Sequence, residues 1–233
     1  MAALAGDDDE AAAVEAAARL STLPLQTFQI AAGGRQWSIM AVRDQDALLQ
    51  SADQFGVFPY GLLLWDSAVA LADTLAGMDS LAARRVLELG AGVGLAGLAA
   101  RARGAEVVQT DHGREALELC RRNAILNHLD GIATRTGDWD RWDDTSRYDL
   151  IVGSDILYDV EAHAPVLAIL QRNLQVGGKV ILSDPGRPLT PGFVALLEAS
   201  NFDILQHTRR VPAVHPLFPG HAVDVAVIMA RRR

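Results

Sequence analysis

The chain has 233 residues, of which 50% are hydrophobic and 21% are charged, so it suits one α/β domain and excludes an intrinsically disordered protein. Asp and Glu number 29 against 21 Lys and Arg, for a formal net charge of −8, which disfavours non-specific binding to a nucleic acid. Cys120 is the only cysteine, which excludes a disulfide bond within the chain and favours a reducing compartment.

Residues 1–25 form an acidic, alanine-rich leader that we expect to be either helical or disordered. From Asp7 onward, acidic residues suit the positive end of a helix dipole, and alanine has the highest helix propensity. The leader lacks the basic segment and apolar core of a secretion signal. Since no apolar run approaches the roughly 20 residues of a membrane span, we also expect no attachment to a membrane.

A β-hairpin is the simplest interpretation of the next segment. Gly33 and Gly34 separate two stretches that read as extended, residues 27–30 and 36–40. We therefore assign residues 26–60 to an N-terminal hairpin and a connecting segment.

The remaining residues, 61–233, alternate strand and helix signals, which is typical of a doubly wound, Rossmann-like parallel sheet. We expect one catalytic domain here, with a sheet of seven strands. The expected strands are residues 84–89, 105–110, 131–136, 148–153, 179–183, 202–210 and 222–230. The expected helices begin near Trp65 and run to residue 76, then cover 94–103, 114–127, about 160–174, and 192–200.

The strongest motif is a buried strand that ends in a glycine turn and opens a helix, residues 86–97. Such a turn lets a ligand approach the backbone, and it offers the amides of a helix N-terminus. Two cofactors compete for it. Gly92, Gly94 and Gly97, with Asp111 about 20 residues further on, satisfy the dinucleotide fingerprint and predict an NAD(P)-binding or flavin oxidoreductase.

The second way to align the motif begins with Glu88 and continues with Gly90, Gly92 and Gly94, with Ala91 inside the turn. This is the acidic-x-Gly-x-Gly-x-Gly arrangement of methyltransferases that use S-adenosylmethionine (SAM). SAM carries an amino group and a sulfonium in place of a pyrophosphate, so an acid at the strand end attracts it and repels a dinucleotide. Glu88 therefore favours SAM. A turn that serves only close packing of helix and strand remains the alternative.

Two further strand ends carry candidate SAM ligands. Asp111 closes the second strand, where its carboxylate can accept hydrogen bonds from both ribose hydroxyls; a cap or turn after Thr110 is the alternative. Asp138 and Trp139 follow the third strand and offer an acceptor for the adenine amino group and an aromatic plane for its ring. Trp142 can take the place of Trp139.

Asp155 and Tyr158 follow the fourth strand, at the sheet edge where open α/β proteins bind ligands. Methyl transfer is an in-line displacement that needs a well-placed neutral amine. Asp155 can orient that amine by accepting a hydrogen bond, and Tyr158 can supply an aromatic wall and a hydroxyl. Because a carboxylate by itself favours the charged amine, we assign no general base. Asp155 or Asp159 can also cap the helix that follows.

With these motifs, the chain resembles the seven-β-strand protein-lysine methyltransferases, methyltransferase family 16, over about residues 55–184. The most specific matches are Gly61-Leu-Leu-Leu-Trp65-Asp-Ser-Ala, Leu87-Glu-Leu-Gly-Ala-Gly-Val-Gly94, Thr110-Asp111, Asp138-Trp139 and Ser154-Asp155-Ile-Leu-Tyr158. The resemblance implies a class I methyltransferase fold with a SAM pocket. In that pocket it implies roles for Trp65, the glycine turn, Asp111, Trp139 and Ser154, and it puts Asp155 and Tyr158 beside the target nitrogen.

The leading hypothesis is a cytoplasmic, SAM-dependent N-methyltransferase that modifies a lysine of a protein, with a monomer favoured. A methyltransferase for a small molecule or a protein histidine, an NAD(P)-binding oxidoreductase, and a SAM-binding adaptor without turnover are the alternatives. We expect no nucleic acid substrate, because Ile156 and Leu157 stand where a nucleic-acid amino-methyltransferase would carry two prolines. The histidines show no ligand spacing, so no metal site is expected.

Overall fold

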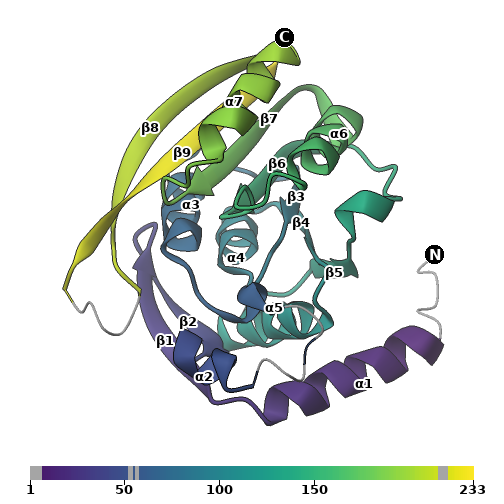
Figure 1. Cartoon of the computed structure of the whole chain (residues 1–233), viewed down its shortest axis with the longest axis vertical. Coiled ribbons are helices and arrows are strands. Elements are labelled where there is room, and N and C mark those ends of the chain that lie inside the picture. Colours follow the sequence, from purple (N-terminus) through teal and green to yellow (C-terminus); the bar gives the residue numbers. More distant parts are fainter. Residues whose placement is uncertain (1–6, 52–54, 56–57, 215–219) are drawn as a thin grey trace.

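In the computed structural model, which describes residues 7–51, 55, 58–214 and 220–233, seven strands form one sheet in the order β5-β4-β3-β6-β7-β9-β8 (Figure 1). The strands are β3 (Arg85–Leu89), β4 (Glu106–Asp111), β5 (Ile132–Thr136), β6 (Tyr148–Ser154), β7 (Leu174–Asp184), β8 (Phe202–Pro212) and β9 (Ala222–Arg232). Neighbours from β5 to β7 are parallel, whereas β9 is antiparallel to both β7 and β8. Because the chain moves outward from β3 in both directions, β3 and β6 flank the point where the strand order reverses.

Helices cover both faces of this sheet, because successive side chains of a strand point to opposite faces. On β3, Val86 packs into one hydrophobic cluster, and Leu87 and Leu89 pack into the other. The first cluster includes residues of α3 (Asp66–Ala76), α4 (Leu95–Ala102) and α5 (Arg114–Leu126), and the second includes residues of α6 (His163–Asn173) and α7 (Thr190–Ala199).

The predicted doubly wound, seven-stranded sheet is confirmed, apart from the reversed direction of β9. Two element boundaries also differ from the prediction by three residues or more. Helix α6 begins at His163 and not near Val160. Strand β7 begins at Leu174 and not at Lys179, because Leu174 pairs with Tyr148 at the start of β6.

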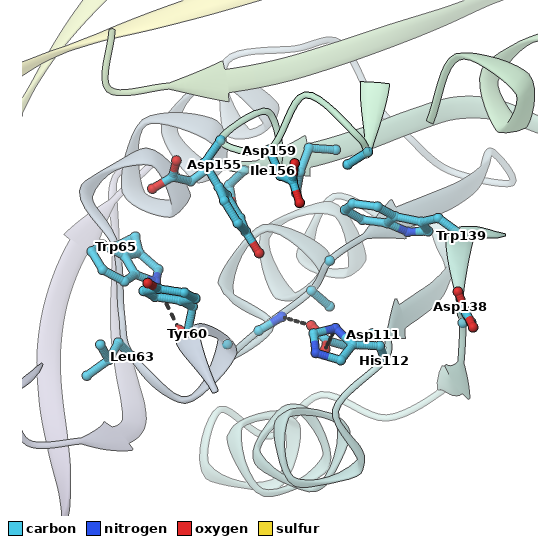
Figure 2. A pocket seen from close by; sticks show the side chains of 18 of the residues that line it. Tyr60, Leu63, Trp65, Asp111, His112, Asp138, Trp139, Asp155, Ile156 and Asp159 are labelled. Carbon is cyan, nitrogen blue, oxygen red and sulfur yellow. Dashed lines mark hydrogen bonds and ion pairs between the residues drawn. The ribbon is translucent and has the colours of Figure 1, made fainter. Parts of the chain in front are cut away.

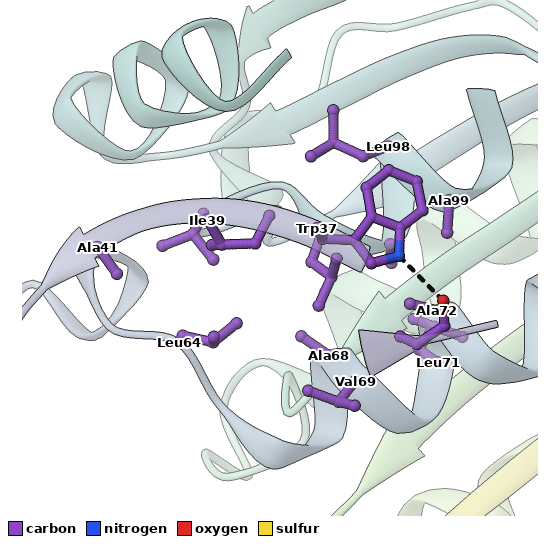
Figure 3. Packing of buried hydrophobic residues seen from close by; sticks show 14 of the residues in the cluster. Trp37, Ile39, Ala41, Leu64, Ala68, Val69, Leu71, Ala72, Leu98 and Ala99 are labelled. Atoms are coloured by element: carbon purple, nitrogen blue, oxygen red, sulfur yellow. Dashed lines mark hydrogen bonds between the residues drawn. The ribbon is translucent and has the colours of Figure 1, made fainter. Parts of the chain in front are cut away.

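The N-terminal part packs against helices of the first cluster. Its elements are α1 (Asp7–Ser21), β1 (Leu25–Ala32), β2 (Arg35–Val42), α2 (Gln45–Leu49) and a 3-10 helix (Tyr60–Leu62). Of these, α1 and β2 contact α5, and β1 contacts α3. Trp37 of β2 is buried among residues of α3 and α4, and its indole nitrogen donates to the Ala32 carbonyl oxygen at 3.0 Å (Figure 3). The hairpin of β1 and β2 therefore shares the core of the domain. Among the described helices, none is long and apolar enough to cross a membrane.

Two buried asparagines bind the free edge of β2: Asn123 of α5, and Asn127, which caps the C-terminus of that helix. The Asn123 side chain accepts from the Met40 amide at 2.7 Å and donates to the Met40 carbonyl oxygen at 3.0 Å. One turn later, Asn127 accepts from the Ser38 amide at 3.0 Å and donates to its carbonyl oxygen at 2.8 Å. Asn123 also donates to the carbonyl oxygen of Val93, at 2.8 Å. These amides satisfy backbone groups that β2 would otherwise leave unpaired.

Candidate functional site

A cavity of about 290 Å³ lies at the carboxyl ends of β3, β4 and β6, beside the point where the strand order reverses (Figure 2). Open α/β proteins bind their ligands at this position. Figure 2 shows Trp65 and Tyr60 on one side of the space and Trp139 and Asp138 on the other. The structure brings all but two of the predicted site residues onto the wall: Trp65, Gly90, Ala91, Gly92, Asp111, Asp138, Trp139, Ser154, Asp155 and Tyr158. Glu88 and Gly94 are not on it.

The glycine loop, residues 90–94, presents bare backbone to the cavity at Gly90 and Gly92, because side chains would not fit at these two positions. Gly90 has a φ of +60°, and a Cβ on it would lie 2.8 Å from Ile156 Cγ2. Gly92 has a φ of +54°, and its Cβ would lie 3.1 Å from the carbonyl oxygen of Gly61. Both positions therefore require glycine for conformation and for space.

Asp111 is fixed against the glycine loop. Its two carboxylate oxygens accept from the Gly92 amide at 2.9 Å and from the Gly113 amide at 2.8 Å. Each oxygen keeps a further lone pair, so the carboxylate can still accept hydrogen bonds from a ligand in the cavity. Because the Gly92 amide is already used, this loop offers less to a pyrophosphate than a dinucleotide-binding loop does.

Glu88 lies beneath the glycine loop and does not reach the cavity. It has the same strand parity as Val86, so its side chain points toward α4. There Oε2 accepts from the Gly97 amide at 2.9 Å and from Gln109 Nε2 at 2.7 Å. Burial raises the pKa of this carboxyl group to about 7. The predicted direct contact of Glu88 with a ligand's positive charge is thus not what the structure shows; the side chain supports the start of α4.

Gly94 also faces away from the cavity. A Cβ on it would lie 2.8 Å from Gln109 Nε2 and 2.9 Å from Cys120 Sγ. Its role in the structure is therefore close packing of the loop on β4 and α5. At Gly94, therefore, the structure agrees with the alternative interpretation of the motif, in which a glycine serves close packing and not ligand binding.

The adenine end of the predicted pocket is formed by Asp138 and Trp139. Asp138 accepts from the Asp140 amide at 3.0 Å and caps the 3-10 helix (Trp139–Arg141). The Trp139 ring borders Gly90, since a Cβ there would lie 3.4 Å from the ring. Trp142, the alternative, is not on the wall: its indole nitrogen donates to Asn173 Oδ1 at 3.0 Å. Of these two candidate indoles, only that of Trp139 lies on the wall.

The opposite end, which we name the acceptor end, contains Tyr60, Asp155 and Tyr158. The rings of Tyr60 and Tyr158 lie 5.7 Å apart, and the two residues are 44% and 45% exposed. Burial, and next the charge of Asp111, raise the pKa of the Tyr158 hydroxyl, so the phenol is neutral. Asp155 is buried and does not cap a helix, since both of its carboxylate oxygens pair with Arg187.

Sequence reasoning missed three features of this site. Tyr60 carried no motif of its own, and Arg187 stood in a stretch that reads as a turn. The third feature is the identity of the acidic rim, for which the sequence offered residues 143–144: Asp140, Asp159 and Glu161 join Asp111, Asp138 and Asp155 on the wall, which contains no Lys or Arg among its described residues. This wall suits a cationic ligand and repels a pyrophosphate.

Within the described part of the chain, no group of three or more His, Cys, Asp or Glu is placed to hold a metal ion.

Similar proteins include methyltransferases of several kinds. The chain is 36% identical over 115 residues to histone-arginine methyltransferase METTL23 of Xenopus laevis, covering 46% of this chain and 49% of that one. It is 37% identical over 128 residues to protein N-lysine methyltransferase METTL21A of Danio rerio, covering 52% and 58%. The matched part thus spans about half the length of these relatives.

Solved structures share the fold at lower identity. The 16S rRNA N2 G1207 methyltransferase RsmC of T. thermophilus, in complex with AdoMet and guanosine, has a TM-score of 0.60 at 21% identity, covering 90% of this chain and 51% of that one. The ribosomal protein L11 methylase of Lactobacillus delbrueckii subsp. bulgaricus has a TM-score of 0.55 at 24% identity, covering 70% and 77%. These likenesses support the fold.

The family model described as "Lysine methyltransferase" matches residues 44–188, which is more than half of the chain. The match includes the glycine loop, Asp111, Trp139, Asp155 and Tyr158. The resemblance inferred from the motifs is therefore confirmed, and the chain belongs to this family of lysine methyltransferases.

Proposed function

We propose that this protein is a SAM-dependent N-methyltransferase that modifies a lysine side chain of a protein. The observation that carries the proposal is one cavity with an acidic wall that includes no Lys or Arg among its described residues. A fixed carboxylate and an indole lie at one end, and a carboxylate with two phenols lies at the other. Family membership supports the same reaction class.

The residues present fit SAM. Asp111 has lone pairs left for ribose hydroxyls, and Asp138 and Trp139 suit an adenine, with an acceptor beside a flat apolar surface. The bare backbone at Gly90 and Gly92 suits the amino-acid part of the molecule. SAM, when bound there, supplies an electrophilic methyl group on a positively charged sulfur. The same acidic wall opposes the pyrophosphate of NAD(P), so we do not retain the oxidoreductase alternative.

The acceptor end suits an amine that arrives as a cation and reacts as a neutral group. Asp140, Asp159 and Glu161 on the rim attract a basic segment of a substrate, and the Tyr60 and Tyr158 rings stabilise a cation at close range. Reaction then depends on holding the nitrogen lone pair in line. This charge pattern favours a lysine of a protein substrate over an uncharged small molecule.

Other methyl acceptors remain distinguishable by experiment. Relatives are named for arginine, lysine and histidine targets, the last being the histidine protein methyltransferase 1 homolog of Dictyostelium discoideum, 28% identical over 149 residues, 60% of this chain and 48% of that one. We propose lysine because the family description and the acidic rim both favour it.

We also propose that the protein is cytoplasmic and monomeric. The one cysteine, Cys120, is a buried free thiol, which suits a reducing compartment.

Two measurements test the proposal in sequence. Calorimetric titration with SAM, with its demethylated product and with NADH should give binding for the first two alone. Host extract incubated with isotopically labelled SAM and the protein, then analysed by mass spectrometry, should show labelled methyl groups on lysine. Binding of NADH but not of SAM would reject SAM as the cofactor. Labelled methyl groups on histidine or on small molecules would reject lysine as the acceptor. SAM binding without methyl transfer would favour an adaptor without turnover.

A further inference from the structure

Asp155 and Tyr158, the two residues that the family motif puts beside the methyl acceptor, are both held by one side chain from outside that motif. Arg187 Nε lies 2.5 Å from Asp155 Oδ1, and Arg187 Nη2 lies 2.8 Å from Asp155 Oδ2, which is a bidentate pair. The guanidinium carbon is also 5.6 Å from the centroid of the Tyr158 ring. Arg187 itself is not on the cavity wall.

The loop after β7 is built to deliver this arginine. Buried Asp184, the last residue of β7, accepts from the amides of Gly186 at 2.8 Å and of Arg187 at 2.7 Å, which fixes the start of the loop. The Asp155 amide donates to the carbonyl oxygen of Ser183 at 2.8 Å. Asp155 is therefore bound to this end of β7 by its backbone and to the following loop by its side chain.

Asp155 also has a backbone conformation that needs such support. Its φ is +54°, in the left-handed region that residues with a side chain rarely adopt. The hydrogen bond to Ser183 and the two bonds to Arg187 hold it there. Losing the guanidinium would release the carboxylate and leave a buried charge without a counterion.

The ion pair between Asp155 and Arg187 changes the charge next to a substrate amine. A bare carboxylate next to a lysine stabilises the ammonium form, which has no lone pair to donate. With Arg187 in place, the amine faces an ion pair with little net charge, while Asp155 keeps lone pairs that can accept a hydrogen bond from the N–H. The other ionisable groups near this pair are Asp184 beside Arg187, and Tyr60, Asp111 and Asp159 beside Tyr158.

We infer that Arg187 is a positioning residue for methyl transfer: it fixes Asp155 and Tyr158 at the acceptor end and, by neutralising Asp155, lets the entering amine lose its proton. This inference rests on the proposed function. It predicts a pH effect that a purely structural arginine would not produce.

The test compares Arg187→Met, Arg187→Lys and the double variant Asp155→Asn/Arg187→Met with the parent. Initial rates of labelled methyl transfer from SAM to lysine are measured in unfractionated host protein at limiting concentration, from pH 6.5 to 10. Arg187→Met should move the rising limb of the pH profile upward by about one unit, which is an approximately tenfold lower rate on that limb. The rising limb of Arg187→Lys should lie between those of the parent and Arg187→Met. In the double variant, the rising limb should return toward the parent position.

A matched control exists in Arg135, which also pairs with carboxylates, Asp143 and Asp144, and lies 5.9 Å from the centroid of an indole, Trp142. None of these residues is on the wall, so Arg135→Met should leave the limb in place. Thermal unfolding and SAM titration of each variant show whether it is folded. A limb that stays at the parent position in folded Arg187→Met would overturn the inference, and so would a double variant that fails to restore it. Absence of SAM binding or transfer in the parent is a different result, which rejects the proposed function.

Discussion

Replacing Glu88 by glutamine should abolish a pH dependence of stability that originates beneath the glycine loop. Burial is the main cause that raises the pKa of Glu88 from 4.5 to about 7, with hydrogen bonds from Gln109 and Gly97 acting in the opposite direction. A carboxyl group whose pKa is raised by folding holds its proton more tightly in the folded state. Its contribution to stability is therefore complete below about pH 4.5 and is lost as the pH rises through about 7.

The size of the effect follows from the shift. A change of about 2.5 pH units, at about 1.4 kcal/mol per unit, corresponds to a loss of about 3 kcal/mol in the free energy of unfolding between pH 4.5 and 8. Glutamine keeps the shape and an oxygen that can accept from Gly97 and Gln109, but it does not titrate. The parent and Glu88→Gln should therefore be similar in stability at pH 4.5, with the variant more stable at pH 8.

Urea unfolding at half-unit intervals across this range measures the difference between the two proteins. Asp144→Asn is a suitable control: hydrogen bonds from Tyr148 and Ser146 outweigh burial and lower the pKa of Asp144, so its titration lies below the window. The difference between the parent and this control should be constant from pH 5 to 8. A constant difference between the parent and Glu88→Gln would refute the argument that the Glu88 carboxyl is neutral in the folded protein near pH 6.

Three further outcomes are expected. Asp155→Ala should reduce labelled methyl transfer at least 100-fold while SAM affinity measured by calorimetry changes less than about threefold, because the residue lies at the acceptor end; parental activity would remove it from the mechanism. Trp139→Leu should weaken SAM binding by about 1–2 kcal/mol, whereas Trp142→Leu should lower stability and leave affinity intact; equal affinities for SAM would argue against the indole contact. Gly90→Ala should cost about 2 kcal/mol in urea unfolding, and Gly34→Ala, which has a positive φ but no neighbour within 4 Å, about 1; equal losses would show that the contact with Ile156 is harmless.

Local patterns were sufficient for much of this fold and site. The alternation of apolar strands and helices predicted the doubly wound sheet, and the residues that end β3, β4, β5 and β6 were expected at one edge, where the cavity lies. The order of the strands and the reversal of β9 depend on pairings between distant segments, such as Lys179 with Arg231, which leave no local signal. The early start of β7 likewise depends on its pairing with Tyr148.

Side-chain direction explains the rest of the differences. The motif alone suggested that Glu88 faces a ligand, whereas Glu88 shares the face of β3 on which Val86 packs, and that face is covered by α4. The choice between Trp139 and Trp142 was open because both follow the same strand, and a hydrogen bond to Asn173 decides it. Arg187 could not be assigned, because a single arginine in a turn has no spacing that links it to a carboxylate 32 positions earlier.

Asn123 of α5 and its C-cap residue Asn127 act as a substitute neighbouring strand for β2. An open strand edge invites another chain to add to it, and Asn123 and Asn127 occupy that edge with side-chain amides. Because Asn123 also binds the Val93 carbonyl oxygen within the glycine loop, one residue joins the hairpin to the ligand cavity. Damage to the hairpin would consequently be transmitted to the glycine loop of a cavity whose wall contains no hairpin residue.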